Sequence, residues 1–424
     1  MADGICVLVV GSGGREHALA LALSRDPSVA ELHIAPGNPG TAPLGANHPV
    51  DTLDGGAIAA LASGLAADLV VIGPEAPLVA GVADAVRAAG IACFGPSAAA
   101  AQLEGSKAFA KQVMAAAGVP TGDSRVCRTA AETLAALAEF GNPYVVKDDG
   151  LAGGKGVVVT EDHEAAIEHA ARCAQVVIEE YLDGPEVSLF ALTDGTTVRP
   201  LQPAQDFKRV GDGDAGPNTG GMGAYTPLPW APADLVEEVT RTVLQPTVDE
   251  MAARGTPFVG LLYAGLALTS RGVRVIEFNA RFGDPETQAL LACLETPLGQ
   301  LLFSAATGTL AEQPPLVWAD GAAVAVVLAA AGYPKAPTTG GVVEGLDVVV
   351  GENGDVVIQA GTAFDAYGRV ISTGGRVLAV VGKGDDLATA RMAAYDAIAK
   401  IKLPGSFYRC DIAQWAAEQT VSGS

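Results

Sequence analysis

The chain has 424 residues, of which 49% are hydrophobic and 17% are charged, a composition typical of globular proteins and long enough for two to four domains. Its formal net charge of -22 argues against nucleic acid or an anionic membrane as a partner, because either would be repelled over much of the surface. The six cysteines are scattered without C-x-x-C spacing, and the longest apolar run, residues 322–331, is too short to span a bilayer. The five histidines show no metal-type pairing either. We therefore expect a soluble cytoplasmic protein without disulfides or a zinc site.

Short apolar runs alternate with helix-like segments over the first hundred residues. Strands are expected at 5–10, 32–35, 69–72 and 91–94, and helices at 15–24, 57–63 and 78–89. This alternation predicts an α/β fold with a doubly wound parallel sheet. Ligands of such sheets bind beyond the carboxyl ends of the strands, which here carry Gly13, Gly14, Arg15, Asn38, Pro74 and Glu75.

The first of these loops does not fit a dinucleotide site. G-x-G-x-x-G would need glycine at position 16, where Glu16 stands, and no acidic residue ends the second strand to hold a ribose. Arg15, with the amides of Gly13 and Gly14 at a helix start, better suits a single phosphate. Glu75 could be a solvated turn carboxylate, although contact with a ligand is preferred. A nicotinamide-dependent oxidoreductase thus remains only a rival hypothesis.

Residues 144–160 combine two β-branched runs with a polar, glycine-rich centre, which predicts a strand, a turn and a second strand. Lys147 ends the first run, and Lys155 lies in the turn. Glycine amides can converge on an anion there, and the lysines supply the positive charge that phosphate oxygens need. A mobile hairpin with solvated lysines is the alternative. The motif is not G-x-x-x-x-G-K-[ST], and a strand follows it, so it suggests the flap of an ATP-grasp enzyme.

The segment that precedes and the one that follows this hairpin add further candidates. Residues 102–117 are expected to form one helix with Lys107 and Lys111 on the same face, Lys111 facing solvent and Lys107 being a phosphate candidate. The strand at 176–180 ends in a Glu-Glu-Tyr-Leu sequence that could present a carboxylate and a backbone amide to adenine. Glu186, six residues on, could hold ribose hydroxyls, although adjacent glutamates usually lie on the surface.

Residues 205–225 are polar and rich in glycine, and we expect an active-site loop without regular secondary structure that adds little to the core. Asp206, Lys208 and Arg209 are its expected contact residues. Further on, Glu277 and Asn279 share one face of the strand expected at 273–279 and offer the oxygen ligands that Mg²⁺ prefers.

Two charged residues follow that strand directly. Arg281 could stabilise a transferring phosphoryl group. Asp284 with Pro285 could instead be a helix N-cap and first-turn pair of purely structural importance.

Six motifs, in this order along the chain, resemble those of the phosphoribosylamine–glycine ligase family of purine biosynthesis. They are Gly-Ser-Gly-Gly-Arg-Glu-His-Ala at 11–18, Gly-Pro-Glu-Ala-Pro-Leu-Val at 73–79, Leu-Glu-Gly-Ser-Lys-Ala-Phe at 103–109, Asp-Gly-Leu-Ala-Gly-Gly-Lys-Gly-Val at 149–157, Gly-Pro-Asn-Thr-Gly-Gly-Met-Gly-Ala-Tyr at 216–225 and Ile-Glu-Phe-Asn-Ala-Arg-Phe-Gly-Asp-Pro-Glu-Thr-Gln at 276–288.

The resemblance implies an ATP-dependent ligase with three domains. They are an N-terminal substrate-binding domain at 1–102, a central ATP-grasp domain at 103–315 with a mobile lid at about 120–188, and a β-rich C-terminal domain at 316–424. The expected activity joins glycine to 5-phosphoribosylamine through glycyl phosphate, in a protein expected to be a monomer. No catalytic group is expected in the C-terminal domain.

The resemblance also assigns roles to individual residues. ATP would be held by Lys107, Lys147, Gly153, Gly154, Lys155, Gly156, Glu179, Glu180, Tyr181, Leu182 and Glu186. Mg²⁺ or Mn²⁺ would be held by Glu277 and Asn279. The two substrates would be bound by Gly13, Gly14, Arg15, Asn38, Pro74, Glu75, Asp206, Lys208, Asn218, Arg281, Gly283 and Asp284, with Arg281, Lys155 and Asp206 in catalytic roles.

Two positions depart from the family pattern. Phe207 stands where the family often has histidine, and Asp148 replaces a frequent alanine, which could weaken the positive potential at Lys147. Three alternatives remain besides the oxidoreductase: another ATP-grasp carboxylate–amine ligase, a biotin-type carboxylase, and an ATP-sensing module without chemistry.

Overall fold

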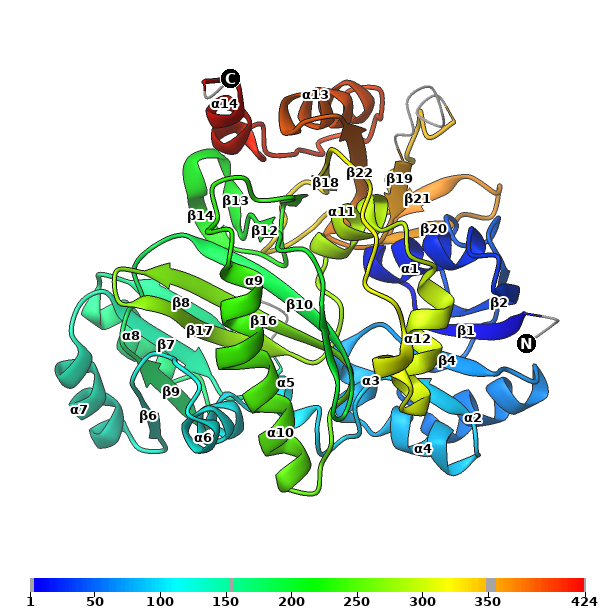
Figure 1. Cartoon of the computed structure of the whole chain (residues 1–424). Helices are drawn as coiled ribbons and strands as arrows, with labels where there is room; N and C mark the ends of the chain where they lie inside the picture. Colours follow the sequence, from blue (N-terminus) through cyan, green and yellow to red (C-terminus); the bar gives the residue numbers. More distant parts are fainter. Residues whose placement is uncertain (1–3, 152–155, 348–355, 423–424) are drawn as a thin grey trace.

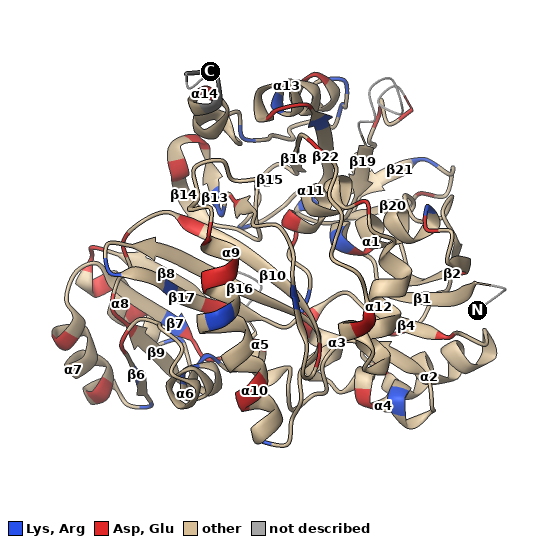
Figure 2. Ribbon diagram, in the orientation of Figure 1, with Lys and Arg blue, Asp and Glu red and all other residues tan. Residues whose placement is uncertain are grey.

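The computed structural model describes residues 4–151, 156–347 and 356–422, and Figure 1 shows their arrangement. The three predicted nucleotide-binding residues Gly153, Gly154 and Lys155 lie outside the described residues. None of the helices within these ranges is long and apolar enough to cross a membrane. Acidic side chains occur on outer helices such as α7 and α10, in keeping with the negative net charge (Figure 2).

The N-terminal sheet is parallel, as predicted, and its strand order is β3-β2-β1-β4-β5. Alternate side chains of β1 point to opposite faces. Leu8 and Val10 pack on the side of α2 and α4, whereas Val7 and Val9 pack on the side of α1 and α12. The doubly wound arrangement is therefore confirmed. The elements are β1 (Ile5–Gly11), α1 (Gly14–Ser24), β2 (Val29–Pro36), β3 (Ala46–Asn47), α2 (Gly55–Gly64), β4 (Leu69–Ile72), α3 (Glu75–Val79), α4 (Val82–Ala88), β5 (Ala92–Phe94) and α12 (Leu298–Thr307).

Two four-stranded antiparallel sheets form the centre of the chain. One has the order β6-β9-β7-β8 and packs with α7 and α8 around a small core of its own; the other has the order β11-β10-β16-β17. The hairpin predicted at 144–160 is present, with Lys147 opposite Val157. These elements are α5 (Gln102–Gly105), α6 (Lys107–Ala117), β6 (Ser124–Cys127), α7 (Ala130–Phe140), β7 (Tyr144–Asp148), β8 (Val157–Thr160), α8 (His163–Ala170), β9 (Val176–Glu179), β10 (Glu186–Asp194), β11 (Val198–Pro200), α9 (Leu235–Val239), η2 (Thr240–Leu244), α10 (Gln245–Ala253), β16 (Val259–Thr269) and β17 (Gly272–Asn279).

A second five-stranded sheet, β12-β15-β18-β22-β19, joins residues of the polar segment to the C-terminal part of the chain. The apolar run at 322–331 supplies β18, all of whose residues are buried, as expected of core. The remaining elements are β12 (Gln205–Asp206), β13 (Arg209–Gly211), η1 (Asp212–Asp214), β14 (Ala215–Asn218), β15 (Gly223–Thr226), α11 (Glu286–Cys293), η3 (Leu310–Glu312), β18 (Ala322–Ala329), β19 (Val356–Gln359), β20 (Thr362–Phe364), β21 (Val370–Ser372), β22 (Arg376–Gly384), α13 (Leu387–Ile398) and α14 (Gln414–Ser422).

Three predictions of local structure were wrong. Residues 205–225 are not a structureless loop, because β13 and β14 form a hairpin, β12 and β15 join a sheet, and Met222 and Tyr225 are buried. The helix at 102–117 is two helices, since Ser106 is extended and caps α6 by accepting a hydrogen bond from the Phe109 amide. The helix at 78–89 is likewise divided, by Gly81 at a φ of 85°.

Candidate active site

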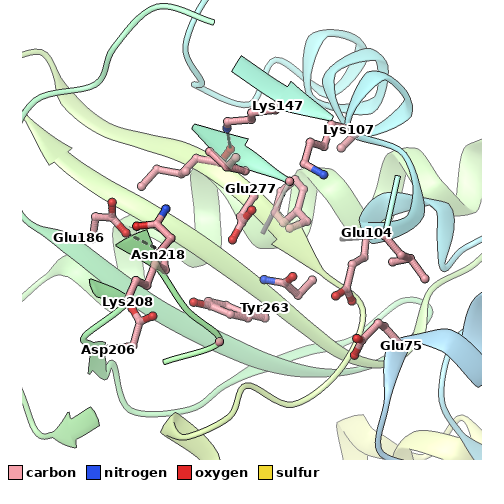
Figure 3. Close-up of a pocket in the computed structure, with 18 of the residues that line it drawn as sticks. Glu75, Glu104, Lys107, Lys147, Glu186, Asp206, Lys208, Asn218, Tyr263 and Glu277 are labelled. Carbon is pink, nitrogen blue, oxygen red and sulfur yellow. Dashed lines mark hydrogen bonds and ion pairs between the residues drawn. The ribbon is translucent and has the colours of Figure 1, made fainter. Parts of the chain in front are cut away.

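A cavity of about 290 Å³ is lined by residues from three parts of the chain: the N-terminal part with the parallel sheet, the central part with the two four-stranded sheets, and the C-terminal part that supplies β22. Its walls combine residues of the β6–β9 sheet region, of β17, of the N-terminal loops and of β22. Figure 3 shows charged side chains directed into this space, with Lys107 and Lys147 on one side, Glu75 and Glu104 on another, and Glu277 between them. A site of this kind can hold an anionic ligand and a cation together.

Two buried lysines surround the carboxylate of Glu179 at one end of the cavity. Its Oε2 lies 3.0 Å from Lys147 Nζ and 3.1 Å from Lys111 Nζ, and the Glu179 side chain is only 3% exposed. Lys147 also donates to the carbonyl of Ile276, at 2.9 Å. Glu179 therefore positions two lysines with its side chain.

Lys111 is buried, contrary to our expectation. We expected Lys111 to face solvent, but its side chain is 9% exposed and donates to Thr121 Oγ1 and the Gly122 carbonyl at 2.9 and 3.0 Å. Burial lowers the pKa of Lys111 and Glu179 counteracts the effect. Helical spacing placed Lys111 one turn from Lys107, but it could not show that Glu179 of β9, Thr121 and Gly122 lie against the Lys111 side chain.

The beginning of the hairpin turn is anchored to the start of α6. Asp149 accepts hydrogen bonds from Ser106 Oγ and from the Ala108 amide, at 3.1 and 3.0 Å. Lys107 Nζ donates to the Gly150 carbonyl at 3.0 Å, and both residues line the cavity, as does Gly156. The predicted phosphate-binding lysines Lys107 and Lys147 are thus brought to one cavity.

Glu277 and Asn279 both line the cavity from β17. Burial opposes ionisation of Glu277, but Lys208 and Lys147, with further cations nearby, lower its pKa. No described basic side chain reaches ion-pairing distance of the Glu277 carboxylate. An ionised carboxylate without a direct partner, beside an amide oxygen on the same strand face, fits a hard divalent cation.

Arg281 lies in a network of carboxylates at the other end. Its guanidinium is 3.0 Å from Glu104 and 3.2 Å from Glu75. Burial opposes the charge, but Glu104 and Glu75 raise the pKa of Arg281, so it stays a cation. Burial also opposes the charge of Glu75, whereas Arg15 and Arg281 lower the pKa of this carboxyl to about 2. Glu75 is therefore a paired carboxylate, not a solvated one.

Asp206 and Lys208 project from the β12 region into the third side of the cavity. Burial, with the charges of Glu286 and Glu186, raises the pKa of Asp206 to about 7 against the opposing effect of Lys208. Lys208 Nζ lies 2.6 Å from Glu186. The buried Tyr263 lies near Asp206 and Lys208 (Figure 3). An aspartate that titrates near neutrality can exchange a proton.

Asp284 is held by residues from opposite ends of the chain. It accepts a hydrogen bond from the Arg15 amide at 3.1 Å and lies 3.4 Å from Arg376, and its side chain does not cap α11. The N-cap hypothesis for Asp284 was therefore wrong. Arg376 also donates to the carbonyls of Gly220 and Asp284, each at 2.6 Å, and lines the cavity. The C-terminal part, for which we expected no catalytic group, thus contributes a charged residue to the cavity.

The other predicted residues divide into three groups. Glu180, Tyr181, Leu182, Glu186 and Asn218 line the cavity. Gly13, Gly14, Asn38, Pro74, Arg209 and Gly283 do not line it. Among these, Gly13 donates its amide to Glu16, and the buried Asn38 donates to the carbonyls of Ser12 and Gln359, at 2.8 and 3.0 Å. The third group, residues 153–155, lies outside the described residues.

Sequence reasoning overlooked four ionisable residues that line the cavity. They are Glu104, Tyr263, Glu286 and Arg376. Glu104 and Glu286 lie within quoted motifs, so the motifs contained the signal but their individual roles were not examined. Tyr263 occurs in an otherwise apolar strand and Arg376 follows two glycines; neither pattern indicates a cavity without the fold.

Comparison with known families covers nearly the whole chain. The N domain of phosphoribosylglycinamide synthetase matches residues 5–104, its ATP-grasp (A) domain matches residues 105–287, and its C domain matches residues 323–415.

Individual proteins agree with these matches. The phosphoribosylamine–glycine ligase of Streptomyces coelicolor is 66% identical over 97% of this chain and 99% of its own. The crystal structure of the Thermotoga maritima phosphoribosylamine–glycine ligase has 33% identity and a TM-score of 0.83, covering 96% of this chain and all of its own. The biotin carboxylase domain of the Hydrogenobacter thermophilus 2-oxoglutarate carboxylase shares the fold alone, with 17% identity, a TM-score of 0.71, and 95% and 92% coverage.

Proposed function

Because this chain belongs to the phosphoribosylamine–glycine ligase family, we propose that it joins glycine to 5-phosphoribosylamine at the expense of ATP, as a step of purine biosynthesis. The products are glycinamide ribonucleotide, ADP and phosphate. One observation carries the proposal: a single cavity holds Lys107 and Lys147 on one side of Glu277 and an arginine–carboxylate network on the other. Such a cavity can bind a triphosphate, a cation and a small carboxylate together.

The reaction that we propose has two steps. A carboxylate oxygen of glycine attacks the γ-phosphorus of ATP, the bond to the β,γ-bridging oxygen breaks, and ADP leaves as glycyl phosphate forms. The amine of phosphoribosylamine then attacks the glycyl carbonyl carbon, phosphate leaves, and one proton is lost from the nitrogen. The first step needs little proton transfer, so positioning and charge neutralisation carry most of the catalysis.

On the nucleotide side, we assign Lys107, Lys147 and Lys155 to the phosphates. The first two support this role by lining the cavity, while Lys155 remains a prediction from the sequence. Glu179, Glu180, Tyr181, Leu182 and Glu186 would surround the nucleoside, with Gly153, Gly154 and Gly156 in the turn. We propose that residues 120–188 act as a lid, because the sheet they contain packs around its own small core.

Family members use a divalent metal ion, and the donors present here fit one. Glu277 and Asn279 would hold it, and bound there it would neutralise charge on the nucleotide phosphates. We propose Mg²⁺, with Mn²⁺ as the alternative, since both favour oxygen ligands.

On the substrate side, Arg281 would stabilise charge on the transferring phosphoryl group, and the raised pKa of Arg281 keeps it protonated. Asp206 would accept the proton that the amine loses, because a pKa of about 7 suits a general base at neutral pH. We propose that Arg15, Glu75, Lys208, Asn218 and Asp284 bind the two substrates, with Gly13, Gly14, Asn38, Pro74 and Gly283 supporting these loops.

The decisive assay combines the purified protein with ATP, Mg²⁺, glycine and freshly prepared phosphoribosylamine, and measures ADP and the amide product. We expect ADP release to depend on both substrates. Release of ADP with bicarbonate and biotin instead would favour a carboxylase, and ATP binding without turnover would favour a sensing module. Cytoplasmic location and a monomeric state remain our predictions, and light scattering after gel filtration tests the second.

A further inference from the structure

A second group of ligand-type side chains lies in the N-terminal sheet, apart from the cavity. Cys6 in β1 and Glu31 and His33 in β2 each offer one ligand atom, and these atoms all lie within 4.8 Å of one another. β1 and β2 are paired in parallel, with Cys6 opposite Glu31, and His33 lies two residues beyond Glu31 on the same face. The backbone register therefore brings the three side chains together.

This cluster is separate from the proposed active site. Cys6 lies near the amino end of β1, and the cavity lies beyond the carboxyl end of that strand, at Arg15 and Glu75. Gly11 lies five positions after Cys6 in β1, a length of about 17 Å at the usual rise per residue. In Figure 1 the amino end of β1 lies at the outer side of the molecule. The ligase reaction uses none of the three side chains.

The ring of His33 is oriented as that of a metal ligand would be. Its Nδ1 lies 3.1 Å from Nε2 of His48, which follows β3. Its Nε2 is buried and has no hydrogen-bond partner among the described residues, and the nearest charged atom is the Glu31 carboxylate at 3.6 Å. A metal-bound histidine usually donates its other ring N–H to a neighbouring acceptor, and His48 can be that acceptor here.

We propose that Cys6 Sγ, Glu31 and His33 Nε2 bind a zinc-type divalent ion, with His48 orienting the His33 ring. Sulfur, imidazole nitrogen and carboxylate are together typical of zinc, whereas Mg²⁺ prefers oxygen ligands alone. Binding displaces the proton of the Cys6 thiol, and water completes a four-coordinate site. Glu31 is 68% exposed, so its carboxylate is free to move onto the ion. The ion would tie β1 to β2 and stabilise the N-terminal sheet.

Cobalt is the probe that separates this site from the ATP site. Metal-free full-length protein is titrated with Co²⁺ alone and the near-ultraviolet absorbance is recorded, because only a cysteine thiolate gives a sulfur-to-cobalt charge-transfer band. We expect the band at one equivalent, its loss on adding Zn²⁺, and a rise in Tm with Zn²⁺. Glu277→Gln should keep the band, since the ATP site offers oxygen ligands.

Variants then assign the ligands. Cys6→Ser should abolish the band, whereas Cys410→Ser, which changes an exposed free cysteine, should keep it. Glu31→Gln changes an exposed side chain and should fold normally but bind more weakly. His48→Phe should weaken binding by about 10–100-fold, the usual effect of losing an outer-shell partner. No band in the unmutated protein, or a band that survives Cys6→Ser, would overturn the proposal.

Discussion

The two ends of the cavity, one of which we propose for the nucleotide and the other for the two substrates, hold their charges in different ways. At the nucleotide end, Glu179 lies between Lys111 and Lys147, three residues within one stretch of the central part of the chain. At the substrate end, Arg281 pairs with Glu75, while Asp284 contacts the Arg15 amide 269 residues away in sequence and Arg376 from the C-terminal part. The first end is built locally, and the second exists only when all three parts are in contact.

This difference has a functional consequence. A locally built nucleotide end can keep its geometry while the remaining parts shift, whereas any shift between parts disturbs the substrate end. We therefore expect damage at the substrate end to affect glycine and phosphoribosylamine more than ATP. The following changes test this contrast.

Glu277→Gln should have the largest effect, because Glu277 lies between the two ends and is the charged donor that we propose for the metal ion. We expect turnover to fall by at least about 10²–10³-fold with the fold unchanged, a loss typical for removal of an electrostatic group from a catalytic site. ADP release measures the loss, and circular dichroism checks the fold. Glu168→Gln, at an exposed helical ion pair, is the matched control. Near-normal ADP release from Glu277→Gln would refute its role.

Comparing Lys147→Met with Lys111→Met should distinguish a residue that binds ATP from one that mainly stabilises the fold at the nucleotide end. Lys147 lines the phosphate side, so its loss should weaken ATP binding by about tenfold or more, equivalent to roughly 1.4 kcal/mol. Lys111 also lines the cavity, but it contacts three protein acceptors, on Glu179, Thr121 and Gly122. Lys147 contacts two, so the loss of Lys111 should have the larger effect on stability and lower the free energy of unfolding by about 1–3 kcal/mol. Calorimetric ATP titration and urea unfolding measure the two effects. Equal losses of affinity in both variants would contradict this division.

Glu75→Gln tests the ion pairs of the substrate end through the pH dependence of the free energy of unfolding. The pKa of Glu75 falls from 4.5 to about 2 on folding, so its ionised form stabilises the folded state above pH 4.5 and this contribution disappears as pH falls towards 2. The stability difference between the unmutated protein and Glu75→Gln should be constant, at roughly 2–3 kcal/mol, above pH 5 and shrink below pH 4.5. Urea unfolding at several pH values measures it, and a difference independent of pH would exclude this pairing.

Phe207→His, which restores the frequent family residue, should have the smallest effect. The Arg409 guanidinium lies 4.9 Å from the centre of the Phe207 ring, and a neutral imidazole would weaken this contact by about 0.5–1 kcal/mol. Turnover should change less than threefold, because Asp206 and Lys208 keep their places. Phe207→Leu serves as a control for ring loss, and a large gain of activity with histidine would show that an imidazole has a chemical role here.

The local patterns predicted the nucleotide end best. The hairpin around Lys147 follows from two β-branched runs joined by turn residues, and it is present where expected. The shared strand face of Glu277 and Asn279 follows from the two-residue period of a strand, and both residues line the cavity. Lys111 was misplaced because helical spacing gives a face but not what covers it. Arg376 was overlooked because its function depends on a strand reaching Gly220 and Asp284 across the fold, which no local pattern encodes.

The pairing of β15 with β18 has a practical implication for anyone dividing this protein into pieces. The four residues of β15, Gly223 to Thr226, lie at the end of the polar segment, and their neighbouring strand, β18, begins nearly one hundred positions later. A version truncated before β18 would leave the amide and carbonyl groups on that side of β15 without partners, and such open edges promote self-association. Fragments for complementation or crystallisation should therefore keep both strands on the same polypeptide.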